Sequence, residues 1–229
     1  MAKLRQLTKN APRPQGFWGK LMLLKMNHGH ARLIRWALSQ VEIGPDDRVL
    51  DIGCGGGRAL KEMAARLEEG SATGVDHAPD AVAASLKKNK KAVKTGRVRV
   101  LEASVSKLPF RGESFTLATA FETVYFWPNL PGDFVEARRV LRPGGELLIG
   151  CEMYKGQPGE ERFRPVVEQL DMHVFYPQEL IELLRQAGFI DIRLYLEEKE
   201  GWMVAVGKKA GHNRRQSGQE AAPAEQSRR

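Results

Sequence analysis

The sequence has 229 residues, of which 42% are hydrophobic and 7% aromatic, a composition typical of one globular domain and not of a disordered or fibrous chain. No apolar run approaches the ~20 residues of a membrane span, and the N-terminus lacks the apolar stretch of a secretory signal, so we expect a cytoplasmic protein without a membrane span. The net charge of +8 lies at the ends, because residues 1–20 carry +5 and residues 207–229 carry +4, which leaves −1 for the body.

The predicted elements begin after a basic stretch, residues 1–16, which we expect to be disordered because it holds too little apolar surface to offset the entropy of ordering. Residues 17–40 alternate apolar and basic positions at helical spacing, and Gly-Pro-Asp-Asp at 44–47 closes this helix. A buried strand at 48–52 then runs directly into a glycine-rich stretch. The helix that follows repeats apolar residues at i, i+3, i+4 and i+7 and stops at a glycine.

Strands and helices alternate through the rest of the sequence. Further strands are predicted near 72–76, 98–103, 115–120 and 146–152, with helices near 79–91 and 133–141. A last helix runs from Pro177 to Gly188, and two strands, 190–198 and 202–208, close the fold through a turn so short that they must be antiparallel. We therefore predict an α/β, doubly wound, Rossmann-like fold: a mostly parallel seven-stranded sheet with a C-terminal antiparallel hairpin and helices on both faces. The polar tail 209–229 is expected to be disordered.

The glycine-rich stretch follows the pattern D-x-G-x-G-x-G from Asp51 to Gly57. Glycines remove the Cβ atoms that would keep the backbone away from a ligand, and they permit positive φ where a strand reverses sharply. The dinucleotide pattern G-x-G-x-x-G is not met because Arg58 stands at its third glycine, and no phosphate-loop lysine follows.

This Asp-Ile-Gly-Cys-Gly-Gly-Gly sequence resembles the first cofactor motif of the class I S-adenosylmethionine-dependent methyltransferases, and the resemblance covers residues 41–207. Later segments appear in the same order as in that family: a strand ending in Asp76, then Leu-Pro-Phe at 108–110, then a strand at 115–120 and Leu-Arg-Pro-Gly-Gly at 141–145. The Leu-Pro-Phe variant is similar to the branch that acts on quinones, sterols and small metabolites.

The resemblance implies one methyltransferase domain at 17–208, with an N-terminal helical lid at 17–44. It also implies S-adenosyl-L-methionine as cofactor, S-adenosyl-L-homocysteine as product, and a small-molecule acceptor. Asp51 would lie near the ammonium group of the cofactor, and Asp76 would accept from its ribose hydroxyls. The implied cofactor-binding residues are Asp51, Gly53, Cys54, Gly55, Asp76, His77, Ser104, Val105 and Phe121. Two positions depart from the family pattern, because Ser104 and Thr116 stand where Asp is common, and a hydroxyl accepts more weakly than a carboxylate.

Methyl transfer is an in-line displacement, so the protein contributes mainly orientation and the exclusion of water, with a general base only where the acceptor must lose a proton. Strand 115–120 points its carboxyl end at the ligand crevice, which makes Phe121, Glu122 and Tyr125 the candidates beside the acceptor. Glu122 is either a general base or a carboxylate at the surface or cofactor edge. The aromatic run 121–128 fits either an apolar acceptor wall or packing under the crevice.

Histidine and cysteine residues give weaker indications. His28, with His30, either presents an imidazole to the acceptor or is a polar residue on a helix turn broken by Gly29. Two histidines without a nearby acidic or cysteine cluster do not indicate a metal, and we expect none. Cys54 and Cys151 are interpreted as small buried thiols.

Three functions remain open at this stage. A small-molecule methyltransferase, monomeric or homodimeric, is favoured by the near-neutral body and by the absence of the Asn/Asp-Pro-Pro-Tyr motif of amide methyltransferases. An RNA or protein methyltransferase would use the basic ends and the basic cluster at 87–99 as a phosphate or acidic-partner grip, although that cluster lacks interleaved aromatic residues and is equally explained as a solvated face. A cofactor-binding protein without catalysis would be consistent with Ser104 and Thr116. The basic cluster consists of Lys87, Lys88, Lys90, Lys91, Lys94, Arg97 and Arg99.

Overall fold

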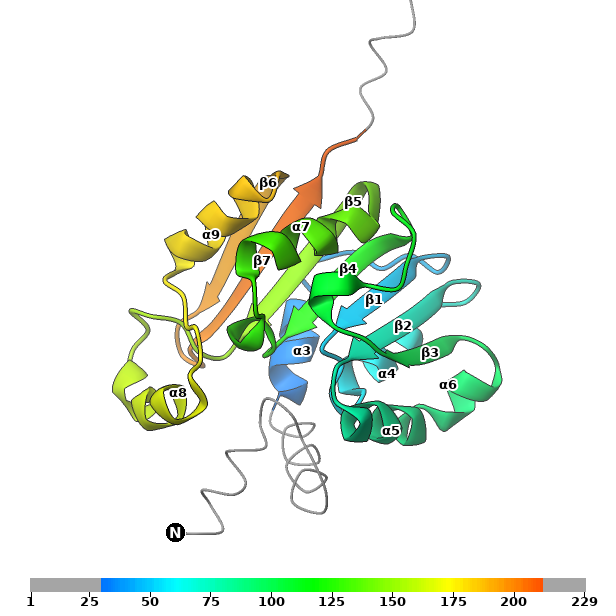
Figure 1. The fold of residues 1–229 in the computed structure, drawn as a ribbon, viewed down its shortest axis with the longest axis horizontal. Coiled ribbons are helices and arrows are strands. Elements are labelled where there is room, and N and C mark those ends of the chain that lie inside the picture. Colours follow the sequence, from blue (N-terminus) through cyan, green and yellow to red (C-terminus); the bar gives the residue numbers. More distant parts are fainter. Residues whose placement is uncertain (1–29, 212–229) are drawn as a thin grey trace, which may run out of the picture.

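A computed structural model describes residues 30–211 and shows one sheet of seven strands (Figure 1). Their order across the sheet is β3-β2-β1-β4-β5-β7-β6, and β7 runs antiparallel to both of its neighbours while the first five strands are parallel. The predicted fold class is therefore confirmed. The strands are β1 Arg48–Ile52, β2 Ser71–Asp76, β3 Val98–Glu102, β4 Phe115–Phe121, β5 Leu141–Cys151, β6 Phe189–Glu197 and β7 Trp202–Lys209.

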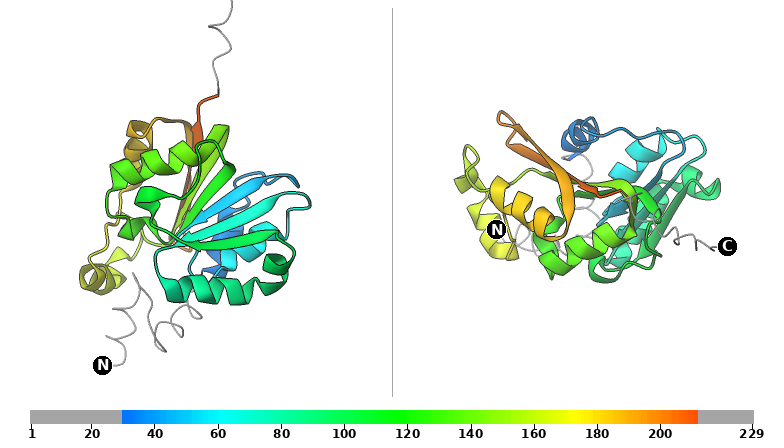
Figure 2. Two further views of the ribbon diagram at one scale, coloured as in Figure 1. Left: turned by 45° about the vertical axis from the view of Figure 1, so that its right-hand side comes forward. Right: turned by 90° about the horizontal axis from the view of Figure 1, so that it is seen from above.

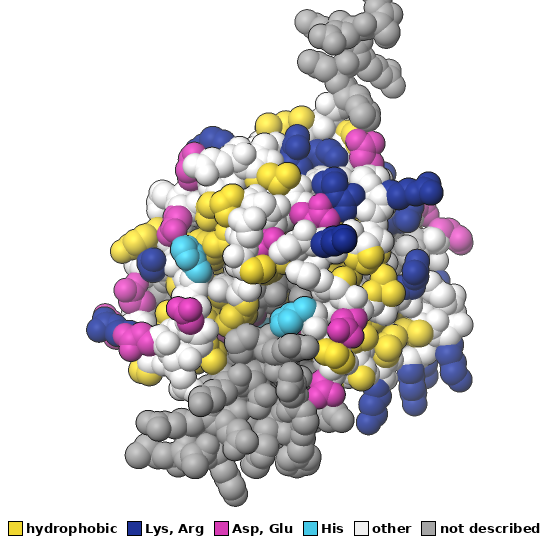
Figure 3. Space-filling view, viewed as in Figure 1, with side chains coloured by type: hydrophobic (Ala, Val, Ile, Leu, Met, Phe, Trp, Pro, Cys, Tyr) yellow, Lys and Arg dark blue, Asp and Glu magenta, His cyan; other side chains and the backbone are white. Residues whose placement is uncertain are grey.

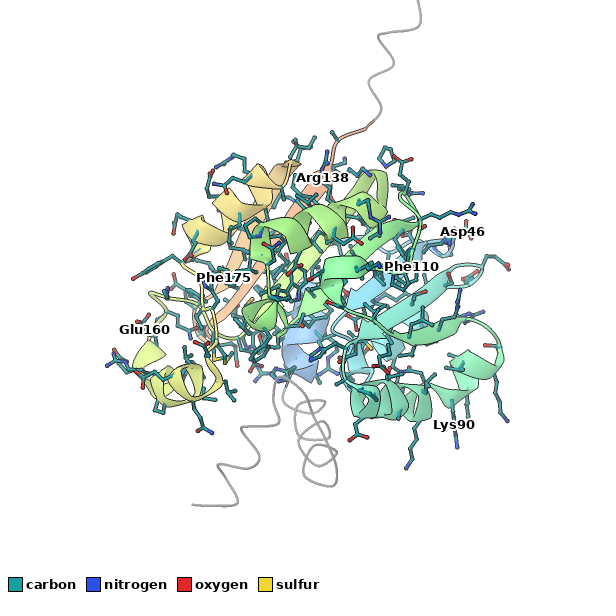
Figure 4. All side chains as sticks on the ribbon, in the orientation of Figure 1. Asp46, Lys90, Phe110, Arg138, Glu160 and Phe175 are labelled. Carbon is teal, nitrogen blue, oxygen red and sulfur yellow. The ribbon has the colours of Figure 1, made fainter. Side chains whose placement is uncertain are left out.

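Helices cover both faces of the sheet (Figure 2). On one face lie α3 Ala31–Ala37, α4 Arg58–Ala64, α5 Pro79–Lys88 and α6 Lys90–Lys94, and on the other lie α7 Leu130–Val140 and α9 Pro177–Gln186. Each face encloses its own apolar core, because the central strands bury side chains on both sides, as parallel strands do. Phe175, labelled in Figure 4, is fully buried in the core under α9. Short elements complete the fold: η1 Val105–Lys107, η2 Val124–Phe126, η3 Glu160–Arg162 and α8 Arg164–Leu170.

The described part of the predicted lid is packed on the body of the protein. Ile34, Ala37 and Leu38 of the α3 region are buried in the core that includes β5 and α4. On the outer side, the Arg32 guanidinium pairs with Glu200 at 2.7 Å and lies over the Trp202 ring. This short helix is thus packed on the body, while the remainder of the predicted lid, residues 17–29, lies outside the described residues, as do residues 1–16 and 212–229 of the two ends. The tail is expected to be disordered from residue 209, but Lys209 ends β7 and its ammonium donates to the Leu141 carbonyl at 2.7 Å.

Three predicted elements have different boundaries in the structure. The helix expected at 79–91 breaks at Asn89, whose side-chain amide donates to the carbonyls of Gly57 and Ser85 and so takes the place of a continuing helix. The helix expected at 133–141 begins earlier, at Leu130. The strand expected at 146–152 already begins at Leu141, and its pairing with β4 has a register irregularity between Leu141 and Glu146. Both cysteines are free and buried, as predicted.

The direction in which strands are added to the sheet reverses between the neighbouring strands β1 and β4. The connections that follow them therefore lead to opposite faces and leave room for a ligand between them. The turn at the end of β1 is held by the Val75 carbonyl of β2, which accepts from the N–H groups of both Gly53 and Cys54 at 2.8 and 2.9 Å. From residue 30 to residue 211, no helix has both the length and the apolar character needed to cross a bilayer.

Gly57 is a residue of this turn whose replacement should cost stability. Its φ is +75°, and an added Cβ would lie 2.4 Å from Ser85 Oγ and 3.0 Å from Ser85 Cα. Gly57→Ala should therefore lower the unfolding free energy by more than the ~1–2 kcal/mol of a left-handed alanine. Gly96→Ala is the matched control, because its φ is +76° and nothing lies within 4 Å of the added atom. Equal losses for the two variants in urea unfolding would contradict the crowding at Gly57.

Candidate functional site

A cleft of about 270 Å³ opens at the carboxyl ends of β1, β2 and β4. Its walls come from the glycine loop, from the loops after β2 and β3, and from the segment after β4. The lining residues are Ile52, Gly53, Gly55, Val75, Asp76, His77, Ala81, Ala103, Ser104, Val105, Phe121, Glu122, Thr123, Phe126, Trp127 and Pro128. The cleft thus lies at the topological switch point, where ligands bind in open α/β sheets.

Gly53 shapes the floor of the cleft by letting two loops meet. Its φ is +74°, and an added Cβ would lie only 2.2 Å from the Thr123 hydroxyl oxygen. The loop after β4 can therefore pack directly on the turn after β1. Thr123 was not among the sequence-predicted site residues, since a threonine in a loop carries no signal of its own.

Asp76, at the end of β2, ties two parts of the cleft together. One carboxylate oxygen accepts from the Gly55 N–H at 2.9 Å, and the other accepts from the Ala78 N–H at 2.9 Å, where α5 is about to begin. The buried carboxylate thereby fixes both the glycine loop and the entry to α5. Each oxygen retains a second lone pair for a ligand hydroxyl.

The loop after β3 forms the opposite end of the cleft. Ser104 Oγ accepts from the Ser106 N–H at 3.2 Å, and Ser106 Oγ donates to Asp133 at 2.7 Å, so the serine is held by the loop itself. Val105 is buried beside it, and His77 faces it with a half-exposed ring. A ligand ring at this end would lie between an apolar wall and polar loop edges.

A second cavity of about 60 Å³ adjoins the first and shares Gly53, Gly55, Phe121 and Glu122 with it. Asp51 and Cys54 line this smaller cavity. Asp51 accepts from the Thr119 hydroxyl at 2.8 Å, yet burial disfavours its charged form and raises its pKa to about 7. Burial also raises the pKa of the Cys54 thiol well above its usual value, so the thiol is neutral.

Glu122 lies where the two cavities meet. It follows β4 directly and has a φ of +57°, an uncommon conformation for a side chain of this type that typically occurs at functional positions. Its carboxylate accepts from Tyr125 Oη at 3.1 Å and from the Glu152 N–H. Burial raises the pKa of Glu122 to about 7, while the nearby His30 acts in the opposite direction.

Tyr125 supports Glu122 from inside the protein. Its ring is 2% exposed, its hydroxyl also accepts from the Met153 N–H at 3.2 Å, and burial holds its pKa well above the usual value. It does not line either cavity of the cleft. The aromatic run at 121–128 is accordingly divided: Phe126 and Trp127 face the cleft, whereas Tyr125 packs beneath it.

His30 and Glu152 complete the acidic end of the cleft. His30 Nδ1 lies 3.3 Å from Glu152 Oε1, and His30, Glu122 and Glu152 present ligand atoms within 4.8 Å of one another. This combination of one imidazole and two carboxylates could ligate a divalent cation. The sequence showed these residues but not their proximity, because they are separated by 92 and 30 positions in the chain. His28 lies outside the described residues.

All nine sequence-predicted cofactor residues line the two adjoining cavities. Thr116, in contrast, lies at the other end of β4, where its hydroxyl accepts from the Arg48 N–H and donates to the Arg48 carbonyl. A carboxylate could not donate that second hydrogen bond. This departure from the family pattern is therefore explained by strand pairing and does not concern the cleft.

Fold and cleft together define an α/β protein of the Rossmann-like class. The model of a methyltransferase-domain family matches residues 50–149. The phthiotriol/phenolphthiotriol dimycocerosates methyltransferase of Mycobacterium leprae is 31% identical over 134 residues, which are 58% of this chain and 48% of that protein. Cycloartenol-C-24-methyltransferase 1 of Oryza sativa is 26% identical over 157 residues, which are 66% and 45% of the two chains.

A solved structure shares the fold: a SAM-dependent methyltransferase from Aquifex aeolicus, with a TM-score of 0.65 and 19% identity over 82% of this chain and 97% of that one. Residues 50–149 therefore match a methyltransferase-domain family, and the chain shares its fold with a SAM-dependent methyltransferase. It spans about half the length of the two curated relatives, at 48% and 45%.

Asp51 should make the free protein less stable as pH rises. Its pKa is about 7 in the folded protein and 3.8 ordinarily, so between these values the folded state binds a proton that the unfolded state lacks, and the unfolding free energy falls with rising pH. Asp51→Asn keeps an oxygen for Thr119 but cannot ionise. We expect it to raise the unfolding free energy at pH 8 by about 2–4 kcal/mol.

Urea unfolding at pH 4.5 and at pH 8 measures this effect, with Asp46→Asn at an exposed position as control. The gain from Asp51→Asn should be small at the lower pH. A gain of the same size at both pH values would mean that the ionisation of Asp51 is not its cause.

Proposed function

We propose that this protein transfers a methyl group from S-adenosylmethionine to a small-molecule acceptor. The observation that carries the proposal is one continuous path from Ser104 and Asp76, past the glycine loop, to Asp51 and Glu122. The residues fit such a cofactor, because the path offers carboxylates for hydroxyl and ammonium groups and a backbone cradle that a Cβ at Gly53 would close. The cofactor, when bound, supplies an electrophilic methyl group on a sulfonium.

In this proposal the protein orients both reactants and excludes water. Asp76, already fixed by two backbone N–H groups, accepts from the ribose hydroxyls, and Ser104 and Val105 border the base. Asp51 faces the ammonium group in the smaller cavity. A positive ligand there favours the charged form of Asp51, so binding should release a proton near neutral pH.

Glu122 serves as the general base in this proposal. It lies at the junction of the two cavities, and its raised pKa of about 7 suits a group that must take a proton near neutral pH. The bound cofactor would supply the electrophilic methyl group, and Glu122 would take the proton that the acceptor loses on methylation.

A small-molecule acceptor fits the two relatives described above, a phthiotriol/phenolphthiotriol dimycocerosates methyltransferase and a cycloartenol-C-24-methyltransferase. The RNA or protein alternative rests on the basic edge formed by α5, α6 and β3, where exposed Lys and Arg side chains gather (Figure 3). Lys90 lies on this outer edge, on the opposite side of the molecule from Glu160 (Figure 4). The remaining proposals are a domain spanning 17–208, a cytoplasmic location and a monomeric or homodimeric state.

The function is tested by incubating the protein with methyl-labelled S-adenosylmethionine and cell extract, and then separating metabolites from RNA and protein. Label should enter the metabolite fraction. Glu122→Gln should lower this transfer at least tenfold with little change in cofactor affinity, because the amide cannot take a proton. Label confined to macromolecules, with transfer that falls steeply with salt, would support the basic-edge alternative. Cofactor binding without transfer to any fraction would indicate a protein that has lost catalysis.

The ribose assignment is tested by Asp76→Ala, which should weaken S-adenosylmethionine binding more than tenfold because two ligand hydroxyls lose a charged acceptor. Glu102→Ala is the matched control, since Glu102 ends the neighbouring strand beside Asp76 but is exposed and outside the cleft. Calorimetry would be run below the unfolding temperature of both variants, because Asp76→Ala also frees two backbone N–H groups. Unchanged affinity in Asp76→Ala would remove Asp76 from the ribose site.

A further inference from the structure

Three titratable side chains meet at the acidic end of the cleft from three separate parts of the fold. His30 precedes α3, Glu122 follows β4, and Glu152 follows β5. Glu152 contacts both of the others: its backbone N–H donates to the Glu122 carboxylate, and its side-chain Oε1 lies 3.3 Å from His30 Nδ1. The three side chains are all partly buried, so their charges are only partly screened by solvent.

The groups around Glu122 differ in how they affect the ionisation of its carboxyl. The groups that face it are His30 from the α3 segment, Glu152 and Cys151 from β5 and its end, and Tyr125 from η2. Burial raises the pKa values of Tyr125 and Cys151, so both stay neutral near pH 7. Among these groups His30 is the one that can carry positive charge. Burial lowers the pKa of His30, but the contact with Glu152 and the charges of Glu122 and Glu152 outweigh burial and raise it.

We propose that His30, held in place by Glu152, is a positioning residue that keeps Glu122 ionised and aimed at the acceptor. The proposal rests on the proposed function, in which Glu122 takes the acceptor proton. Glu152 alone would repel the charge of Glu122, and the His30 imidazolium between the two carboxylates offsets that repulsion. The packing of α3 on β5 therefore brings His30 to the position from which it acts on Glu122.

The geometry favours this role over that of a simple surface ion pair. Ion pairs at the surface contribute little to stability because solvent screens their charges. We expect this of His173 and Glu179, whose 3.0 Å contact involves a half-exposed imidazole. The His30 ring is 20% exposed and its partner is bonded through its own backbone to Glu122. A substitution of His30 should therefore affect Glu122 and not only Glu152.

The pH profile of methyl transfer tests the proposal. His30→Gln removes the positive charge beside Glu122, which raises the pKa of that carboxyl, so the acid limb of kcat/KM should move to higher pH by at least about 0.5 unit. At a pH on this limb, kcat/KM should fall about threefold, and it should approach the unmodified enzyme at high pH. His173→Gln, which removes the exposed histidine contact, should leave the profile unchanged. An unmoved limb in His30→Gln would overturn the proposal.

The double variant His30→Gln/Glu152→Gln supplies a test that loss of packing would not mimic. With His30 gone, removing the Glu152 charge relieves the repulsion on Glu122, so the acid limb should move back toward its original position. Glutamine at 152 keeps the backbone N–H that bonds Glu122. A double variant whose limb lies at still higher pH than that of His30→Gln would contradict the proposed arrangement of charges.

Nuclear magnetic resonance titration of the imidazoles separates this inference from the proposed function, because it needs no turnover. Glu152→Gln should lower the pKa of His30, and so should Glu122→Gln, while His173 should not respond. If labelled methyl is never transferred but this coupling is seen, the proposed function fails and the contact between the three groups stands. Stoichiometric Mn²⁺ binding by the protein that His30→Gln abolishes would overturn the proposal in favour of a metal site.

Discussion

The architecture of the cleft depends on how the turn after β1 is held against the end of β2. Two consecutive N–H groups of that turn share the Val75 carbonyl, and the Asp76 carboxylate, one residue further, accepts from Gly55 and from the start of the α5 segment. Backbone donors that a sharp reversal would otherwise leave buried and unpaired are satisfied by the neighbouring strand. Because the same carboxylate borders the cleft, the group that stabilises the turn is also the one available to a ligand.

Burying acids at one end of a sheet is costly, and the structure shows how each is accommodated. Asp51 has the Thr119 hydroxyl, Asp76 has two backbone donors, and Glu122 has a tyrosine hydroxyl and a backbone N–H. These donors do not fully offset burial for Asp51 and Glu122, whose pKa values are both raised to about 7. Such a site gains most from a positively charged ligand, which would explain why the fold retains groups that lower the stability of the free protein.

The two departures from the family pattern have different physical meanings. The Thr116 hydroxyl donates to the backbone carbonyl of Arg48 and accepts from its N–H at the far end of β4, so this residue supports the pairing of β4 with β1. Ser104 lies in the cleft, where its hydroxyl oxygen accepts from the Ser106 N–H and retains one lone pair and its O–H for a ligand. Only the second departure bears on cofactor recognition, and it leaves Asp76 as the strongest acceptor at that end of the cleft.

The sequence by itself determined the sheet, its hairpin and the glycine loop that borders the cleft. Apolar periodicity and turn residues are local signals of strands and helices. The glycine spacing indicates a sharp backbone turn that few kinds of ligand site contain. Only the tertiary structure decided the acidic end. His30, Glu122 and Glu152 are far apart in the chain and each is unremarkable alone, and it is the packing of α3 on β5 beside the end of β4 that brings them within 4.8 Å. Tertiary structure also decided that Tyr125 supports Glu122 from beneath, because the direction of a side chain after a strand depends on a loop conformation that no local pattern specifies.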